Sequence, residues 1–329
     1  MPRTLSPAGM CLLLLALLTS ALWANTPESA SPSQYEGVLA SGHVDELIPT
    51  LQQQISQIPR NAVARNLLCR AYLMMEDWDH AIAACEQAVY IDPQNSNYSL
   101  WLGRAYGEKA DRASFVSAPG LAKKARESFE RSVELDPKNV EAHVDLGEFY
   151  AEAPGIIGGG RDKAYRQADA LMPLSPAMGH WLLARIAEKE KDPAKAEREY
   201  RAELAVSNSG VRGWLDLANF FMYAHRYEDM EQALTHQETA PIDHPDSLMF
   251  GANLLLRSRR NYPLAVRLMR RYLENRLVEE APAFKAHTIL GEILEKQGDR
   301  QGAAQELRAA LALFQNYPRA KDDLKHLEH

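Results

Sequence analysis

The chain contains several imperfect copies of one segment. The stretch LLCRAYLMMEDWDHAIAACEQAVYIDP, from Leu67 to Pro93, recurs in outline as LWLGRAYGEKA, which AKKARESFERSVELDP completes after an interruption. Later copies begin at VEAHVDLGEFY, GHWLLARIAEKEKDPAKAEREY, VRGWLDLANFFMYAHRYEDMEQAL, NYPLAVRLMRRYL and FKAHTILGEILEKQGDRQGAAQELRAALALF. A repeat period between about 20 and 50 residues is typical of a solenoid or array, in which each unit buries its apolar face against its neighbours.

The copies share small residues at fixed positions, which let two helix axes approach closely, and aromatic residues that fill the space between successive pairs. Leu-small pairs occur at Leu68-Cys69, Leu102-Gly103, Leu146-Gly147, Leu183-Ala184, Leu217-Ala218 and Leu290-Gly291. The aromatic three residues later is Tyr72, Tyr106, Tyr150 or Phe221, and the second helices open with Ala81, Ala125, Ala164, Ala196, Ala265 and Ala303. In these positions the copies resemble the tetratricopeptide (TPR) repeat, which folds as two antiparallel helices over about 34 residues.

The resemblance implies an all-α, TPR-type right-handed superhelix of antiparallel helix pairs. We expect about seven repeats over residues 62–317, after an N-terminal segment at 25–61 that contains a degenerate half-repeat. Residues 318–329 are predicted to form a C-terminal capping helix, because terminal repeats need a polar outer face. Its apolar residues Ala320, Leu324 and Leu327 are spaced to face the last repeat.

The N-terminus has the pattern of a secretory signal. Arg3 precedes an apolar run at 11–23 that is too short to span a bilayer, and Ala24 is the predicted cleavage site. Cys11 opens the run instead of following it, which argues against a lipid anchor. We therefore expect an exported, periplasmic protein with no transmembrane segment in its mature chain.

Export would leave Cys69 and Cys85 as the cysteines of the mature chain, in an oxidising compartment. They occupy facing positions on the two helices of one repeat. They either form a disulfide or remain two buried free thiols, because packed antiparallel helices only sometimes provide the geometry that a disulfide needs.

Two repeats carry insertions at the turn between their helices. Tyr72 and Ala81 are nine residues apart, whereas the equivalent spacings in the next two repeats are nineteen and fourteen, which places insertions at 107–120 and 151–160. Their apolar residues could pack on one another or form a binding edge on one rim of the solenoid. These rim residues are Phe115, Val116, Ile156 and Ile157.

The second insertion, APGIIGGGRDKA, approaches the phosphate-binding pattern GxxxxGK[ST], but Arg161-Asp162 replace Lys-Ser/Thr and a helix is expected where the motif needs a strand. We expect the glycines to form a tight turn with positive φ. A weaker alternative is anion binding by consecutive backbone N–H groups beside Arg161. The segment also resembles APGxxGGxxKA segments of exported bacterial TPR proteins, a group that carries no settled role.

The sequence contains no catalytic or metal-binding pattern. It has neither HExxH nor GxSxG, and His143, His180 and His287 stand at large-residue packing positions of their repeats. We expect no enzyme activity, metal or cofactor. A net charge of −7, with Lys and Arg interleaved among acids, argues against nucleic acid as a partner.

Protein or peptide binding is the function that a repeat superhelix supports, along a concave wall lined by the first helices. The residues that packing leaves free there are Asn66, Arg70, Met74, Trp101, Arg104, Glu108, Asp145, Glu148, Trp181 and Arg185. The arginines either bind a ligand or pair with neighbouring carboxylates. We predict a periplasmic scaffold in envelope assembly, secretion or polymer export. The alternatives are a nucleotide- or anion-binding protein that uses the Gly-rich loop, and a structural subunit embedded in an envelope complex.

Overall fold

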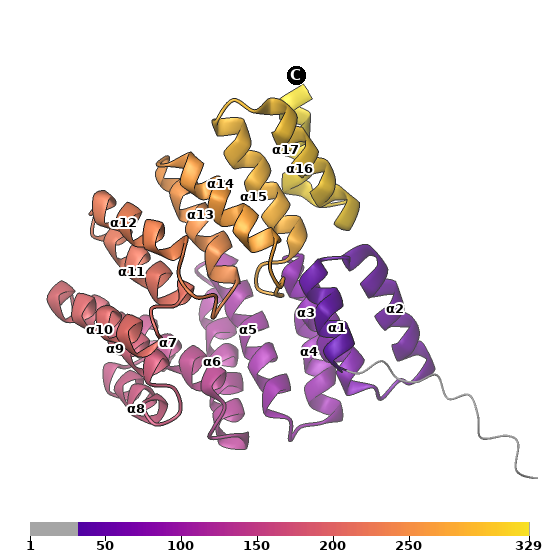
Figure 1. The fold of residues 1–329 in the computed structure, drawn as a ribbon. Helices are drawn as coiled ribbons and strands as arrows, with labels where there is room; N and C mark the ends of the chain where they lie inside the picture. The colour runs from indigo at the N-terminus through magenta and orange to yellow at the C-terminus, as the bar shows by residue number, and fades with distance from the viewer. Residues whose placement is uncertain (1–31, 329) are drawn as a thin grey trace, which may run out of the picture.

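The computed structural model describes residues 32–328, so the predicted signal peptide at 1–24 lies outside the described residues. Over the described range the chain is helical and contains no β-strand, which confirms the all-α prediction (Figure 1). The helices are α1 (Pro32–Ser41), α2 (Val44–Gln57), α3 (Ala62–Met74), α4 (Trp78–Ile91), α5 (Ser96–Arg112), α6 (Ala118–Leu135), α7 (Val140–Glu152), the 3-10 turn η1 (Gly155–Ile157), α8 (Arg161–Leu171), α9 (Pro176–Lys189), α10 (Pro193–Val206), α11 (Val211–Tyr223), α12 (Tyr227–Gln237), α13 (Asp246–Ser258), α14 (Tyr262–Leu273), α15 (Ala283–Lys296), α16 (Arg300–Leu313) and α17 (Pro318–Glu328).

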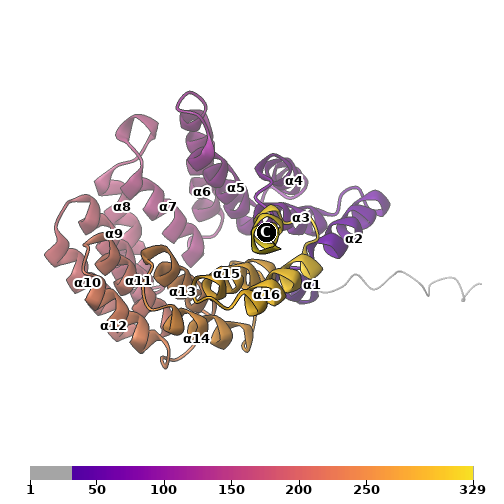
Figure 2. The ribbon, with the colours of Figure 1, turned by 90° about the horizontal axis from the view of Figure 1, so that it is seen from above.

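The helices pack in consecutive pairs, from α3 with α4 to α15 with α16, and each pair contacts the next. Figure 2 shows the odd-numbered helices of these pairs on the inner side of the curve and the even-numbered helices outside. Helices α1 and α2 precede the pairs, and α17 follows them. This is the superhelical arrangement that the repeat pattern predicts.

Short polar residues cap the N-termini of many of the helices. The side-chain oxygen of the residue before each of these helices accepts a first-turn backbone N–H, which satisfies a group that the helix itself cannot bond. The capping residues are Asn61, Asp77, Asn95, Asn139, Ser175, Asp192, Asn261 and Asp299. These short polar residues recur between apolar runs, and they therefore set where the helices begin.

Small residues are required where helices cross. A Cβ atom at Gly103 on α5 would lie 2.4 Å from the Phe129 ring of α6, and one at Gly147 on α7 would lie 2.3 Å from a Leu182 methyl carbon of α9. Both distances are shorter than carbon atoms tolerate without movement. The small member of the Leu-small pair therefore lets a large side chain from the neighbouring helix fill the space.

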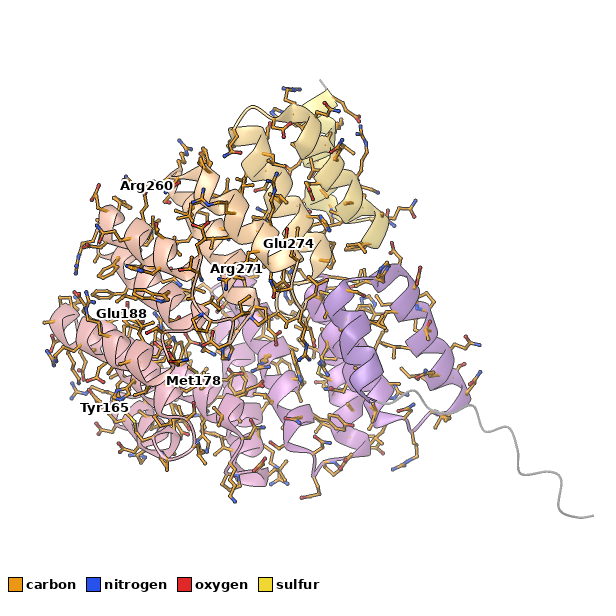
Figure 3. The ribbon with its side chains drawn as sticks, viewed as in Figure 1. Tyr165, Met178, Glu188, Arg260, Arg271 and Glu274 are labelled. Carbon is orange, nitrogen blue, oxygen red and sulfur yellow. A yellow bond between two sulfur atoms is a disulfide. The ribbon has the colours of Figure 1, made fainter. Side chains whose placement is uncertain are left out.

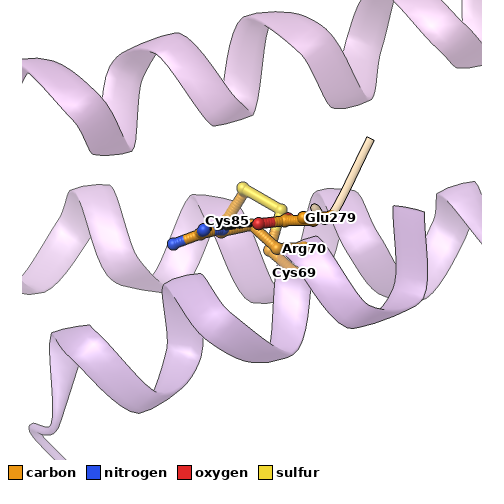
Figure 4. Close-up of a disulfide and its surroundings, with 4 residues drawn as sticks. All are labelled: Cys69, Arg70, Cys85 and Glu279. Carbon is orange, nitrogen blue, oxygen red and sulfur yellow. Dashed lines mark hydrogen bonds and ion pairs between the residues drawn. A yellow bond between two sulfur atoms is a disulfide. The ribbon is translucent and has the colours of Figure 1, made fainter. Parts of the chain in front are cut away.

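Cys69 on α3 and Cys85 on α4 are joined by a disulfide, with their Cα atoms 5.3 Å apart (Figure 4). Both side chains are buried. Of the two arrangements that the sequence allows, the structure contains the bridge. A disulfide that closes a loop of about 15 residues stabilises a fold by about 3 kcal/mol in the chain-entropy model, so it clamps the first repeat pair.

The two insertions differ from each other. Most of the first is helical, because α5 continues to Arg112 and α6 already begins at Ala118, which leaves only residues 113–117 as the turn. The predicted loop at 107–120 is thus too long; Pro119 lies in the first turn of α6, where proline is tolerated. The insertion lengthens both helices, so that their shared turn extends beyond the neighbouring repeat.

The second insertion folds as the expected tight turn. Gly158 and Gly160 have φ values of +98° and +155°, which L-residues rarely adopt. The backbone N–H of Gly160 donates to the carbonyl oxygen of Tyr150 at 2.9 Å, and a Cβ atom at Gly159 would lie 1.8 Å from the carbonyl oxygen of Ala153. The glycines close the turn against the end of α7.

The two ends of the array contact each other. Helix α1 packs against α15, beside which Figures 1 and 2 place it. The fully buried Phe284 of α15 contacts the α1–α2 turn at Gly42 and packs against the rings of Phe314 and Tyr317. The backbone N–H of Gln315 donates to a carboxylate oxygen of Asp45 at 2.7 Å. These contacts join the first two helices to the last helix pair.

Candidate functional site

The inner, or concave, face is formed by α3, α5, α7 and α9, the helices that carry the predicted groove residues. Three of those residues are buried instead of open to solvent: Asn66 and Met74 are each 5% exposed, and Trp181 is 9% exposed. The prediction that they are free for a partner is wrong. The curvature brings successive first helices close together, so large side chains on this face become packing residues.

The arginines of the concave face are all paired. Arg104 on α5 donates through Nε to Asp145 of α7 at 2.7 Å and through Nη2 to Glu141 at 2.8 Å. Arg185 on α9 contacts Glu148 and Glu152 of α7, at 3.3 and 2.9 Å. The arginines thus form a ladder of ion pairs that crosses from each repeat to the next.

Arg185 also donates to Glu188, one turn further along α9, at 2.8 Å. Glu188 lies in the last turn of α9, and Figure 3 labels it apart from Met178, which lies in the first turn of the same helix. The hydroxyl of Tyr200 donates to the same Glu188 carboxylate at 3.1 Å. This end of the ladder is therefore held by both helices of its repeat.

Trp101 lies between two guanidinium groups. The Cζ atoms of Arg70 and Arg104 lie 5.0 and 4.7 Å from the centre of its ring. Cation–π contacts of this kind strengthen as water is excluded. Trp101 is partly buried and contributes to the core, so it anchors the ladder more than it offers a free surface.

A segment that the sequence analysis missed completes the face. Residues 274–282 connect α14 to α15, and Glu279 within them accepts hydrogen bonds from Nε of Arg70 to both carboxylate oxygens, each at 3.0 Å (Figure 4). Lys285 reaches Glu76, beyond the end of α3, at 3.3 Å. The linker's nine residues, longer than the four between α4 and α5, are the only sequence signal for this contact.

Burial changes the pKa values of the carboxylates on the concave face. Desolvation raises the pKa of Asp145, of Glu148 and of Glu279, while the facing arginines act in the opposite direction. A carboxylate with a raised pKa is poorly solvated. It depends on its arginine, and removing either partner alone would leave a buried charge without compensation.

Two further carboxyl groups lie together beneath the ladder. Glu203 of α10 is 1% exposed and lies beside the partly buried Asp216 of α11, which forms an ion pair with Arg212 at 3.6 Å. Arg185 and Asp243 are further charges that act on the pair. Burial and the neighbouring carboxyl raise the pKa of Glu203 well above its usual value, and burial also raises that of Asp216. The pair therefore holds a proton more tightly in the folded chain than when unfolded.

Replacing Glu203 with Gln is expected to stabilise the protein above neutral pH. A folded-state pKa that is raised gives stability present at low pH and lost as pH rises from the unfolded value of about 4.3 through the folded pKa. Each pH unit between the two values corresponds to about 1.4 kcal/mol. Between pH 5 and 8 the melting temperature should decrease less with rising pH for Glu203→Gln than for the wild type. Glu134→Gln, at an exposed residue, is the control. A variant that melts lower than wild type at pH 8 would contradict the assignment.

The rim residues are exposed. Phe115 and Ile156 are each 94% exposed and Val116 is 89% exposed, whereas Ile157 is partly buried. The alternative in which the four side chains pack on one another is therefore wrong. The α5–α6 turn is too far extended, by the added helical residues, for its tip to reach the compact α7–α8 turn.

A pocket of about 720 Å³ opens beside the Gly-rich turn, between α7, α8 and α9. Its lining includes Arg161, Lys163, Arg166 and Lys189. Lys163 donates to the carbonyl oxygen of Gly158 at 2.9 Å and lies over the Tyr150 ring. Lys163 therefore stabilises the turn, whereas Arg161, Arg166 and Lys189 are exposed to solvent.

The three histidines each bond to the second helix of their own repeat. His143 contacts Gln167 at 2.7 Å, His180 contacts Glu199 at 2.9 Å and His287 contacts Glu306 at 2.6 Å. Between residues 32 and 328, no three His, Cys, Asp or Glu side chains are grouped as a metal site would need. The histidines link the two helices of a pair.

Two segments of the chain, residues 38–105 and 252–318, match family models described as tetratricopeptide repeat. Among solved structures, yeast Tom70 aligns with 94% of this chain and 66% of its own, at 13% identity and a TM-score of 0.54. A thermophilic TPR protein of Thermus thermophilus aligns with 58% of this chain and 100% of its own, at 18% identity and a TM-score of 0.48. A search of curated proteins found no match.

These findings confirm tetratricopeptide repeats in the chain, and the identities support a likeness of fold alone. Among helices α1 to α17, none combines the length and the apolar character that crossing a bilayer requires. The tetratricopeptide fold implies protein partners.

Proposed function

We propose that the chain is an exported tetratricopeptide scaffold that holds a protein partner in envelope assembly, secretion or polymer export. The signal pattern at residues 1–24 supports export. The observation that carries the binding role is the ion-pair ladder on α5, α7 and α9, which presents alternating arginines and carboxylates on successive first helices. A partner segment with complementary charges can meet this ladder repeat by repeat.

The ladder retains groups that a partner can reach. The side chains of Glu141 and Glu148 are 66% and 41% exposed, and Arg104 and Arg185 are about one quarter exposed beside them. The ion pair of Arg104 with Glu141, the most exposed carboxylate of the ladder, contributes only about 0–1 kcal/mol, so a carboxylate of the partner can replace Glu141 at little cost. A peptide held in this way is expected to bind with a Kd of about 1 μM, or about −8 kcal/mol.

The partner is expected to crosslink to the concave face and not to the outer helices. A photo-crosslinking amino acid placed at Glu148 or Glu108 should yield adducts with one and the same protein in the producing cell. The matched control is Tyr90 on α4, which is 76% exposed on the second helix of its pair. Equal adduct yield at position 90, or different proteins from positions 108 and 148, would reject the concave face as the binding surface.

The structure of the Gly-rich turn gives less support to nucleotide binding than to the scaffold role. Helix α7 precedes it, and Arg161 and Asp162 follow Gly160 at the start of α8. The pocket beside it nevertheless contains several cations, so the anion alternative is testable. ATP, GTP and inorganic phosphate are expected to leave the melting temperature unchanged, and a shift with ATP that Arg161→Ser abolishes would support the alternative.

A further inference from the structure

The most exposed large apolar side chains of the described residues lie at the tips of two neighbouring turns. Phe115 and Val116 are at the α5–α6 turn, and Ile156 is at the α7–α8 turn. Both turns lie along the same edge of the superhelix, at the top of Figure 2, and η1 contacts α6. Side chains of this size, about nine-tenths exposed and grouped on one edge, mark an interaction surface.

The tips carry positive charge on an acidic protein. Residues 109–124 contain Lys109, Arg112, Lys123 and Lys124 against the single Asp111, and residues 153–166 contain Arg161, Lys163 and Arg166 against the single Asp162. The chain as a whole has a net charge of −7. The tip segments themselves thus carry an excess of basic residues, of which Lys109, Arg112, Lys123 and Arg161 form ion pairs with Asp79, Glu76, Glu127 and Glu190.

The acids of α6 lie further from the edge. Glu127 is nine residues beyond Ala118, the first residue of the helix. At 1.5 Å per residue it is about 13 Å along α6, and its carboxylate lies 3.8 Å from Nζ of Lys123. Within α6, Lys123 and Lys124 therefore lie closer to the tip than the first acid of the helix.

We propose that this rim contacts the headgroup surface of an anionic phospholipid bilayer, with Phe115, Val116 and Ile156 entering the interface. Apolar tips flanked by Lys and Arg have the composition that interfacial membrane contacts use. Each Lys or Arg near an anionic leaflet strengthens binding about fivefold. Arg161 and Arg166, at the mouth of the 720 Å³ pocket, are placed to meet headgroup phosphates.

A protein surface fits these observations less well. Protein interfaces place their anchor residues at the centre of a patch that fills and receives pockets. Here the three side chains project from the ends of separate turns, and six of the twelve residues that line the pocket between α7, α8 and α9 are charged. A deformable, anionic surface accepts two separate tips without needing a matching shape.

The test is sedimentation of the full chain with vesicles of phosphatidylcholine and phosphatidylglycerol in a 70:30 ratio, beside vesicles of phosphatidylcholine alone. Wild type is expected to bind the anionic vesicles and to be released as salt is raised. The triple variant Phe115→Ser, Val116→Ser, Ile156→Ser should bind at least tenfold more weakly at an unchanged melting temperature. The matched control replaces Ile58, Tyr90 and Tyr223, which are exposed elsewhere, with Ser.

A second measurement distinguishes insertion of Phe115 into the bilayer from binding at the vesicle surface. Phe115→Trp should show a blue shift of tryptophan fluorescence on anionic vesicles against the wild-type background, and Arg161→Ser with Arg166→Ser should weaken binding. The proposal is overturned if the wild type does not bind anionic vesicles. It is also overturned if the control triple variant loses as much binding as the rim triple variant. Binding without a blue shift overturns the insertion of Phe115. If the rim variant loses a protein partner while wild type ignores vesicles, the rim is a protein-docking surface instead.

Discussion

Phe284→Ala is expected to separate the two ends of the array. The side chain is fully buried between the α1–α2 turn and the rings of Phe314 and Tyr317. Removing a buried Phe ring costs about 3–5 kcal/mol, and at 2–4 °C per kcal/mol for a domain of this size the melting temperature should fall by roughly 6–20 °C. The loss of structure is expected at the two ends, because the contacts of Phe284 join elements there.

The readouts are chosen to detect this opening. Backbone amides of α2 should exchange hydrogen faster in the variant, and the radius of gyration from small-angle scattering should increase. Phe115→Ala is the matched control, since it is the same substitution at a side chain that is 94% exposed. If α2 exchanges as slowly in Phe284→Ala as in wild type, the ends are not held together by this residue.

The pairing of helices could be predicted from sequence, and the meeting of the ends could not. Gly103 and Ala81 occupy positions that recur in most of the copies, because these helix pairs repeat the same close crossing. The contact of Arg70 with Glu279 joins residues 209 apart. This contact depends on the total rotation along the array, which is the sum of the small rotations from each repeat to the next. The sequence of a single repeat does not determine that total.

The accumulated rotation between repeats also explains why some residues of the concave face that were predicted to be free are buried. Trp181 stands at a position that is free in an open superhelix, but here the tight curvature buries it, and the Cζ atoms of Arg185 and Arg212 each lie 6.0 Å from its ring centre. Replacing it with Ala would remove core packing, so it is unsuited to a binding test. The repeat pattern places Arg104 and Glu148 on the correct face because their helical positions alone determine which way they point.

Ending the chain after Pro318 is expected to cause aggregation. Truncation removes α17, whose Ala320 and Leu327 are buried and whose Leu324 packs on the core, as their spacing predicts. It also removes the ion pair of Arg319 with Glu292 of α15, at 2.5 Å. The apolar side of α16 would become an exposed end of the array, and terminal repeats need a polar outer face to stay soluble.

Point variants separate the apolar contact from the loss of chain length. Leu324→Ser with Leu327→Ser should reproduce most of the effect, since burying a Leu contributes about 1.5–3 kcal/mol. Lys321→Ser with Lys325→Ser, on the exposed side of the same helix, should leave the melting temperature within about 1 °C of wild type, because surface substitutions usually change stability by less than about 0.5 kcal/mol. Light scattering and thermal melts of the three proteins measure this. A truncated chain that stays monomeric and melts like wild type would show that α16 ends the array by itself, with its apolar face covered in some other way.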